Sequence, residues 1–224
     1  MIDVTLIDSM GTDLSVVNAA RVSFGKKSTW SGQEGGLDDG EGGMGVLNDT
    51  DSKLIHYLAK HKHMSPFGHA FASFHVKAPV FVARQLVKHK FLRWNEISRR
   101  YVDDGISFYY PEVWRSKATD KKQGSGPALA DQEIDLGTTH TVVAQLYNSL
   151  LDRGVCPEQA RMVLPQNTMT EWYWSGSLDA FADMCNLRTK NDTQWETRDV
   201  AFQIDAEMQN LYPVSWLALT RGIQ

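Results

Sequence analysis

Residues 72–88 read ASFHVKAPVFVARQLVK, and their pattern changes from that of a strand to that of a helix within one short segment. Every second residue from 72 to 78 is apolar and the residues between them are polar, a period of two that predicts a half-buried strand. Pro79 then suits the first turn of a helix, and the apolar residues that follow recur at helical spacing to about Lys88. The stretch therefore predicts a strand that passes directly into a helix.

The remaining pattern places strands early in the chain and helices late. Residues 4–7 predict a second short strand, whereas most of the chain beyond residue 130 has helical spacing. Asp51 is expected to cap a helix. The expected helices cover residues 14–22, 51–60, 131–151, 157–164, 177–187 and 192 to just before 213. This order predicts a single α+β domain over residues 1–224, with a small β-sheet packed with helices and a largely helical C-terminal half.

Two polar stretches interrupt these elements. Residues 31–45 contain seven glycines and four acidic residues in fifteen positions, so they cannot bury enough apolar surface to offset the entropy of ordering. We expect a mobile Gly-rich surface loop there, either a tolerated insertion or a lid that orders over a substrate. Residues 117–130 contain Lys, Gln, Gly, Ser and Pro and predict a second loop.

Composition and charge exclude several classes of protein. The 224 residues are 42% hydrophobic and 22% charged, near the globular average, with a net charge of −4. Two cysteines, Cys156 and Cys185, are too few for a disulfide framework, and the N-terminus lacks the basic and apolar regions of a signal peptide. No uncharged apolar run approaches the length of a membrane span. We expect a cytoplasmic protein with no membrane association.

One segment is strongly basic although the chain as a whole has a net negative charge. Between residues 84 and 100, six Lys or Arg residues stand against one Glu, and hydrogen-bonding side chains lie between them. Such a cluster predicts an anionic ligand with polar groups to recognise. The aromatic residues Phe91, Trp94 and Tyr101 leave a single-stranded nucleic-acid-binding module as an alternative, which the net charge of −4 disfavours. A solvated charged face is the third interpretation.

Two other patterns argue against metal and against a dinucleotide-binding fold. His61, His63, His69 and His75 do not have the spacing of a zinc site, and no cysteine pair joins them. No Gly-x-Gly-x-x-Gly sequence follows a strand and opens a helix. We expect no metal ion, and a Rossmann flavoprotein is disfavoured.

The order of residues 88–101, KHKFLRWNEISRRY, is more specific. It resembles the signature of the flavin-dependent thymidylate synthases, the ThyX family, in which Arg-His-Arg is followed after seven residues by Ser, with Asn-Glu before that Ser and Arg-Tyr after it. Further blocks that resemble the family are residues 63–69, 78–85, 160–165 and 186–188. The likeness extends from about residue 56 to about residue 195.

The resemblance implies a ThyX-like fold and an activity. Members of the family methylate dUMP to dTMP, taking the carbon from 5,10-methylenetetrahydrofolate and passing reducing equivalents from NADPH through FAD. The resemblance also implies a homotetramer whose active sites form between subunits. The family's reaction involves no attack of an enzyme thiol on the uracil ring. Neither Cys156 nor Cys185 is therefore expected to act as a nucleophile. No nucleic-acid partner is implied.

The resemblance also assigns residues to the site. Arg188 would be catalytic, because the matching arginine is held to favour the N3-deprotonated uracil; an arginine that interacts with a helix dipole is the alternative. The residues that would contact dUMP are Gln85, Leu86, Val87, Lys88, Glu96, Ile97, Ser98, Arg99, Arg100, Arg161 and Arg188. Those that would contact FAD are Ser65, Lys88, His89, Lys90, Glu96, Ser177, Leu178, Asp179 and Asp183.

Several positions depart from the family pattern: Arg93, Arg99, Ser177 and Asp183 differ from its usual residues, as do Lys88, Lys90 and Gly68. Lys88 and Lys90 stand where the family usually has Arg, and Gly68 stands where it usually has Glu. The lysines keep the positive charge but lose the planar geometry that binds phosphate through two hydrogen bonds. A member that binds flavin or nucleotide but has lost methylation is therefore a further alternative.

Overall fold

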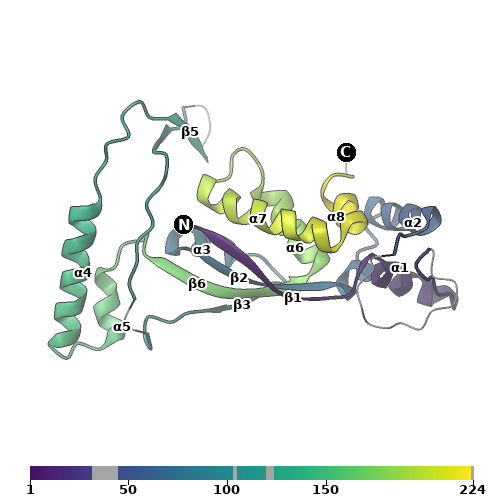
Figure 1. Cartoon of the computed structure of the whole chain (residues 1–224), viewed down its shortest axis with the longest axis horizontal. Coiled ribbons are helices and arrows are strands. Elements are labelled where there is room, and N and C mark those ends of the chain that lie inside the picture. Colours follow the sequence, from purple (N-terminus) through teal and green to yellow (C-terminus); the bar gives the residue numbers. More distant parts are fainter. Residues whose placement is uncertain (32–44, 103–104, 120–123, 223–224) are drawn as a thin grey trace.

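Figure 1 shows the computed structural model, which describes residues 1–31, 45–102, 105–119 and 124–222. Its strands are β1 (Asp3–Met10), β2 (Phe71–Pro79), β3 (Arg93–Glu96), β4 (Arg115–Lys117), β5 (Ser125–Ala128) and β6 (Met169–Ser177). Its α-helices are α1 (Asp13–Arg21), α2 (Asp49–Lys60), α3 (Val80–Leu86), α4 (Gly137–Asp152), α5 (Pro157–Ala160), α6 (Leu178–Arg188), α7 (Trp195–Leu211) and α8 (Pro213–Thr220). Short 3₁₀ turns are η1 (Val22–Phe24), η2 (Ser65–His69) and η3 (Arg161–Val163). The α+β class expected from the sequence is confirmed.

A four-stranded antiparallel sheet, in the order β1-β2-β6-β3, forms the centre of the molecule. β2 confirms the strand expected from the alternation over residues 72–78, and it passes at Pro79 directly into α3. β6 lies between β2 and β3 and places Trp174 opposite Phe74. The C-terminal half is largely helical, as expected, and it also contributes β6 to the sheet, a strand that the sequence analysis does not predict.

Helices cover one face of this sheet. Figure 1 shows α6, α7 and α8 together on that side. Phe74, Trp172 and Trp174 project toward the helices and are almost completely buried. Phe181 of α6 packs edge-on against Phe74 and Trp174, with ring centroids 5.2 and 5.6 Å apart. Burial of these large side chains is the main apolar contribution to the core.

The opposite face of the sheet is polar. His75 Nε2 and Lys77 Nζ lie 3.3 and 3.5 Å from Glu171 Oε2, and Tyr173 lies beside the His75 ring with 51% of its surface exposed. Among the described residues, no helix covers this face in the single chain (Figure 1). The sheet therefore has one face packed on the core and one face in contact with solvent, as antiparallel sheets commonly do.

Several helix boundaries differ from the sequence expectations. The helix expected over 131–151 begins at Gly137, and α3 ends two residues before Lys88. Residues 157–164 form only the single turn α5 followed by η3, and α8 was not expected. The loop expected over 117–130 contains part of a hairpin, in which β4 pairs with β5. Within the described residues, no helix is both long and apolar enough to span a bilayer.

The start of α2 corrects the cap assigned to Asp51. Asn48 is the N-cap, because its Oδ1 accepts from the backbone N–H of Asp51 at 2.8 Å. Asp51 is fully buried and instead accepts from Arg21 and from Ser28 Oγ. Most of the expected Gly-rich loop, residues 32–44, lies outside the described residues. Ser31 at its edge donates its backbone N–H to the carbonyl of Val46 at 3.0 Å.

A buried carboxylate joins the two ends of the chain. Asp13, in the first turn of α1, is 4% exposed. Its two carboxylate oxygens accept from the backbone N–H groups of Val214 and Ser215 at 2.9 and 2.8 Å. These N–H groups belong to the first turn of α8, where a helix has unsatisfied donors and favours negative charge.

We expect the Asp13→Ala variant to lower the free energy of unfolding by about 2–4 kcal/mol, because two charge-assisted hydrogen bonds are lost and two buried donors are left unpaired. Asp8→Ala is the matched control, since Asp8 is exposed and, among the described residues, accepts only from the N–H of its neighbour Ser9. Urea unfolding at pH 7 measures both. Equal losses in the two variants would contradict this role for Asp13.

Candidate active site

The signature segment lies where the chain reverses between α3 and β3. Phe91 adopts φ 65° in the middle of this reversal, a conformation that is uncommon for a residue other than glycine. Leu92 follows it into the core and packs against Gly176 of β6, where an added Cβ would lie 2.4 Å from Leu92 Cδ2. This contact holds the segment against the sheet and leaves Lys88 and Lys90 exposed to solvent.

Three of the expected site residues meet at the end of α6. Arg188 Nε donates to Nε2 of His89 at 2.9 Å, and Arg188 Nη2 donates to the backbone carbonyl of Gln85 at 3.2 Å. Burial and the neighbouring Arg188 charge lower the pKa of His89 to about 4, and burial lowers the pKa of Arg188. At neutral pH the imidazole is therefore neutral and accepts at Nε2. We call Gln85, His89 and Arg188 the Arg188 group.

Glu96 is held close to the same part of the sheet by hydrogen bonds from Thr170 and Trp94. Its Oε1 accepts from Thr170 Oγ1 at 2.8 Å, and its Oε2 accepts from Trp94 Nε1 at 3.2 Å. The Trp94 ring lies edge-on to Trp174, with centroids 5.7 Å apart, and the Trp174 ring lies 6.4 Å from that of His89. The aromatic side chains thus connect Glu96 to the Arg188 group across the helix-covered face.

Three other expected residues form a second, more exposed cluster. Ser98 Oγ accepts from the backbone N–H and from Nε of Arg100, both at 3.3 Å. Arg100 Nη1 lies 3.8 Å from a carboxylate oxygen of Glu158, and Arg161 Nε donates to the Glu158 carbonyl at 3.3 Å. We call Ser98, Arg100 and Arg161 the Ser98 group. In the described part of the chain, no hydrogen bond or ion pair joins it to the Arg188 group.

Two neighbours of Ser98 line a separate cavity of about 460 Å³. Ile97 donates its backbone N–H to the carbonyl of Glu171 at 2.9 Å, which continues the edge of the sheet. Arg99 Nη2 donates to the carbonyl of Gly105 at 3.3 Å. Both side chains are half-buried, so the signature residues after Glu96 face a hollow at the end of β3.

The residues expected to contact a flavin come together only in part. The backbone N–H of Leu178 donates to the carbonyl of Ala70 at 2.9 Å, which joins the start of α6 to the end of η2, the turn that begins with the exposed Ser65. Ser177 and Asp179 flank Leu178 and are half-buried. Leu178 itself is fully buried, as is Leu86 of the expected nucleotide set, so neither side chain offers surface to a ligand.

Helix α6 carries two carboxylates, those of Asp179 and Asp183, which interact electrostatically. Burial and the charge of Asp179 raise the pKa of Asp183. Asp179 Oδ1 is buried and has no hydrogen-bond partner among the described residues. Such a pair suits hydroxyl or amide donors on a ligand and does not suit a phosphate. Among the described residues, no cluster of His, Cys, Asp and Glu could hold a metal ion.

The structure adds residues that the sequence analysis did not single out. Gln85 and Arg188 line a cavity of about 400 Å³ together with Gln194, the residue before α7. The Gln85 Nε2 donates to Gln194 Oε1, and Thr197 Oγ1 donates to Gln85 Oε1 at 3.2 Å. The run Gln-Trp-Glu-Thr at 194–197, at the expected start of a helix, is the only sequence signal for them.

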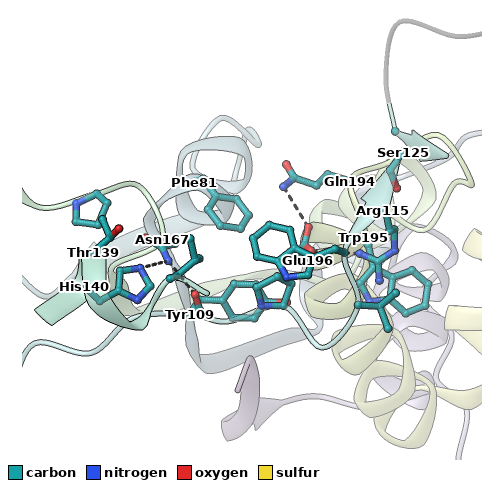
Figure 2. Close-up of a pocket in the computed structure, with 16 residues that line it drawn as sticks. Phe81, Tyr109, Arg115, Ser125, Thr139, His140, Asn167, Gln194, Trp195 and Glu196 are labelled. Atoms are coloured by element: carbon teal, nitrogen blue, oxygen red, sulfur yellow. Dashed lines mark hydrogen bonds and ion pairs between the residues drawn. The ribbon is translucent and has the colours of Figure 1, made fainter. Parts of the chain in front are cut away.

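A larger cavity of about 570 Å³ adjoins this one and shares Gln194 (Figure 2). In Figure 2, Gln194 points to Glu196, while Arg115 lies beside the Trp195 ring, 4.8 Å from its centroid. Burial and the charge of Glu196 raise the pKa of Tyr109, which also lines the cavity, to about 12. The phenol therefore remains protonated over the physiological range.

The comparisons with known proteins agree on one family. The family model described as "Thymidylate synthase complementing protein" matches residues 5–214. A flavin-dependent thymidylate synthase of Thermus thermophilus is 40% identical over 218 residues, which are 96% of this chain and 74% of that protein. The flavin-dependent thymidylate synthase of Kosmotoga olearia is 36% identical over 96% of this chain and 88% of its own length.

Solved structures give the same result. The crystal structure of a UMP/dUMP methylase, PolB from Streptomyces cacaoi, bound with 5-Br dUMP, superimposes with a TM-score of 0.81 at 32% identity and covers 100% of this chain and 97% of that one. The same protein bound with 5-Br UMP also has a TM-score of 0.81. With the signature, the fold and these matches in agreement, the chain belongs to the flavin-dependent thymidylate synthase family.

Proposed function

We propose that this chain methylates dUMP to dTMP, with FAD as its cofactor and with NADPH and 5,10-methylenetetrahydrofolate as co-substrates. The observation that carries the proposal is the setting of Arg188. Its guanidinium lines a cavity beside Gln85, and its hydrogen-bond partners among the described residues, a neutral imidazole and a backbone carbonyl, carry no charge. A partly buried cation without a carboxylate attracts an anionic ligand.

Arg188 has the hydrogen-bonding capacity for such a ligand. A guanidinium carries five N–H donors, and the two contacts above use two of them, which leaves three. A fixed positive charge at this position would stabilise a uracil ring that has lost its N3 proton, because the charge acts where negative charge develops. His89 supports this arrangement by accepting from Nε without adding a second positive charge.

The residues near the signature also fit FAD. Lys88 and Lys90 are exposed cations suited to a diphosphate. When bound, FAD would supply the redox chemistry that completes the transferred methyl group. Ser65, on the neighbouring turn η2, would face the same ligand, and Gly68, with nothing within 4 Å of an added Cβ, leaves space there.

We further propose that complete sites form between subunits of a homotetramer. The Arg188 group and the Ser98 group both carry positive charge that suits a nucleotide, yet no contact joins them within the described part of one chain. A second copy that brings its Ser98 group to the Arg188 group of the first would complete the site.

We expect Arg188→Ala to lower kcat/KM for dTMP formation by at least about 100-fold, because it removes the charge that stabilises the uracil anion. The measurement is tritium release from dUMP labelled at C5, with UMP assayed in parallel because the PolB structures hold analogues of both nucleotides. Arg153→Ala, at an exposed arginine after α4, is the control. Near-normal turnover of a folded Arg188→Ala protein would remove this role.

The pKa of His89, lowered from 6.5 to about 4, predicts a pH dependence of stability. Between these two values the unfolded chain binds more protons at His89 than the folded chain, so the free energy of unfolding falls as the pH drops through this window. A His89→Gln variant should show a smaller fall. Urea unfolding at pH 7 and pH 4.5 compares the two proteins, and equal falls would contradict a neutral His89.

Shared sites predict complementation between inactive variants. Arg188→Ala damages one group and Arg100→Ala damages the other, so a mixed oligomer would contain some sites with both groups intact. Co-expression with two affinity tags isolates the mixed oligomers, and random pairing gives about a quarter of the wild-type activity. Mixed oligomers no more active than either parent, or an obligate monomer in light scattering, would contradict sites shared in this way.

A further inference from the structure

A chain of hydrogen bonds leads from a buried carboxylate to the proposed nucleotide site. Glu196 is 8% exposed, and its Oε2 accepts from Gln194 Nε2 at 3.1 Å. Gln194 in turn accepts at Oε1 from Gln85 Nε2. Gln85 accepts at Oε1 from Thr197 Oγ1 at 3.2 Å, and Thr197 is fully buried. The two amides are thus held in series between one carboxylate and one hydroxyl.

The carboxylate determines how both amides are turned. An ionised carboxylate has no hydrogen to donate, so Gln194 must present its NH₂ group to Glu196 and its carbonyl to Gln85. Gln85 must then present its own NH₂ group to Gln194 and its carbonyl to the Thr197 hydroxyl. Neither amide can flip without placing two acceptors or two donors against each other, which is unfavourable because Glu196 and Thr197 are buried away from water.

Arg115 forms an ion pair with the other oxygen of Glu196. Its Nη1 lies 3.4 Å from Glu196 Oε1, the oxygen that does not bind Gln194. The Arg115 guanidinium also lies over the Trp195 ring, 4.8 Å from its centroid. The two oxygens of Glu196 therefore have separate functions, one in an ion pair and one in the orientation of the amides.

We infer that Glu196 is a positioning residue, which acts through Gln194 to fix the orientation of the Gln85 amide and thereby the recognition of the pyrimidine nucleotide. This inference rests on the proposed function. After its two internal contacts, Gln85 retains one N–H and one oxygen lone pair, and it lines the cavity that contains Arg188. A uracil ring presents two carbonyl oxygens, one on each side of N3, and both are hydrogen-bond acceptors. In the fixed orientation Gln85 offers an N–H donor to such an oxygen, whereas a flipped Gln85 would offer its own carbonyl oxygen, a second acceptor.

Isothermal titration of the purified protein with dUMP tests this assignment. Glu196→Gln keeps the shape but lets either amide flip, and we expect about tenfold weaker dUMP binding, the equivalent of one lost hydrogen bond. In turnover assays the KM for dUMP should rise while kcat changes little. Glu207→Gln, the same change on the same helix, is the matched control and should bind dUMP as the wild type does.

A double-mutant cycle distinguishes positioning from general loss of structure. If Glu196 acts through Gln85, then Glu196→Gln should add no further loss in a Gln85→Ala background. Gln194→Ala, which removes the intermediate amide and leaves the Arg115 ion pair, should reproduce the loss caused by Glu196→Gln. It also serves as the second variant if Glu196→Gln folds poorly.

Two results would overturn the assignment. One is wild-type affinity in both Glu196→Gln and Gln194→Ala, and the other is losses that multiply in the double variant. If either result is obtained while the wild-type chain binds dUMP, only the positioning role of Glu196 is contradicted. A wild-type chain that binds no dUMP would overturn both the proposed function and the role of Glu196.

Discussion

The proposed site depends on one positive charge, that of Arg188, which no carboxylate neutralises among the described residues. Arg188 is held at the end of α6 by His89 and by the carbonyl of Gln85, and neither neutralises its charge. A carboxylate in the place of His89 would bind the guanidinium more strongly and would leave little attraction for a substrate anion. Because His89 is neutral, the structure keeps the cation oriented and available, and the remaining features of the site serve to hold this arrangement in place.

The sheet positions the participants. β6 continues directly into α6, so the register of β6 against β2 determines where Arg188 lies relative to Gln85 at the end of α3. Trp172 and Trp174 of β6 are buried beneath the helices, and Trp94 stacks on Trp172 with centroids 4.4 Å apart. This packing also fixes Glu96, two residues beyond Trp94 on the same strand. Core packing and site geometry therefore depend on the same strand pairing.

Local patterns predicted much of this arrangement. The alternation over 72–78 and the proline after it gave β2 and the start of α3, and the signature over 88–101 led to the family. β6 is not predicted because its residues, MTEWYWSGS, do not alternate between apolar and polar types. The alternation appears only in their burial, which depends on pairing with β2 about a hundred residues earlier in the chain. The cap of α2 was misplaced by three residues, because Asp51 is used for tertiary contacts with Arg21 and Ser28.

The contacts around Gln85 could not have been predicted from spacing. Gln194, Glu196 and Thr197 lie more than one hundred residues beyond Gln85, and only the packing of α7 against α3 brings them together. The separation between the Ser98 group and the Arg188 group could not be predicted from sequence spacing either. Resemblance assigned both to one nucleotide, whereas the geometry of a single chain keeps them in two places and motivates the proposal of shared sites.

The most direct test of the role of Arg188 is to measure the pKa of N3 in dUMP bound to the protein. Ultraviolet difference spectra recorded across a pH titration report this ionisation. If the Arg188 cation acts as proposed, the pKa of N3 in the complex will lie below that of free dUMP, and the shift will disappear in Arg188→Ala. An N3 pKa equal to or above that of the free nucleotide in the wild-type complex would contradict the account.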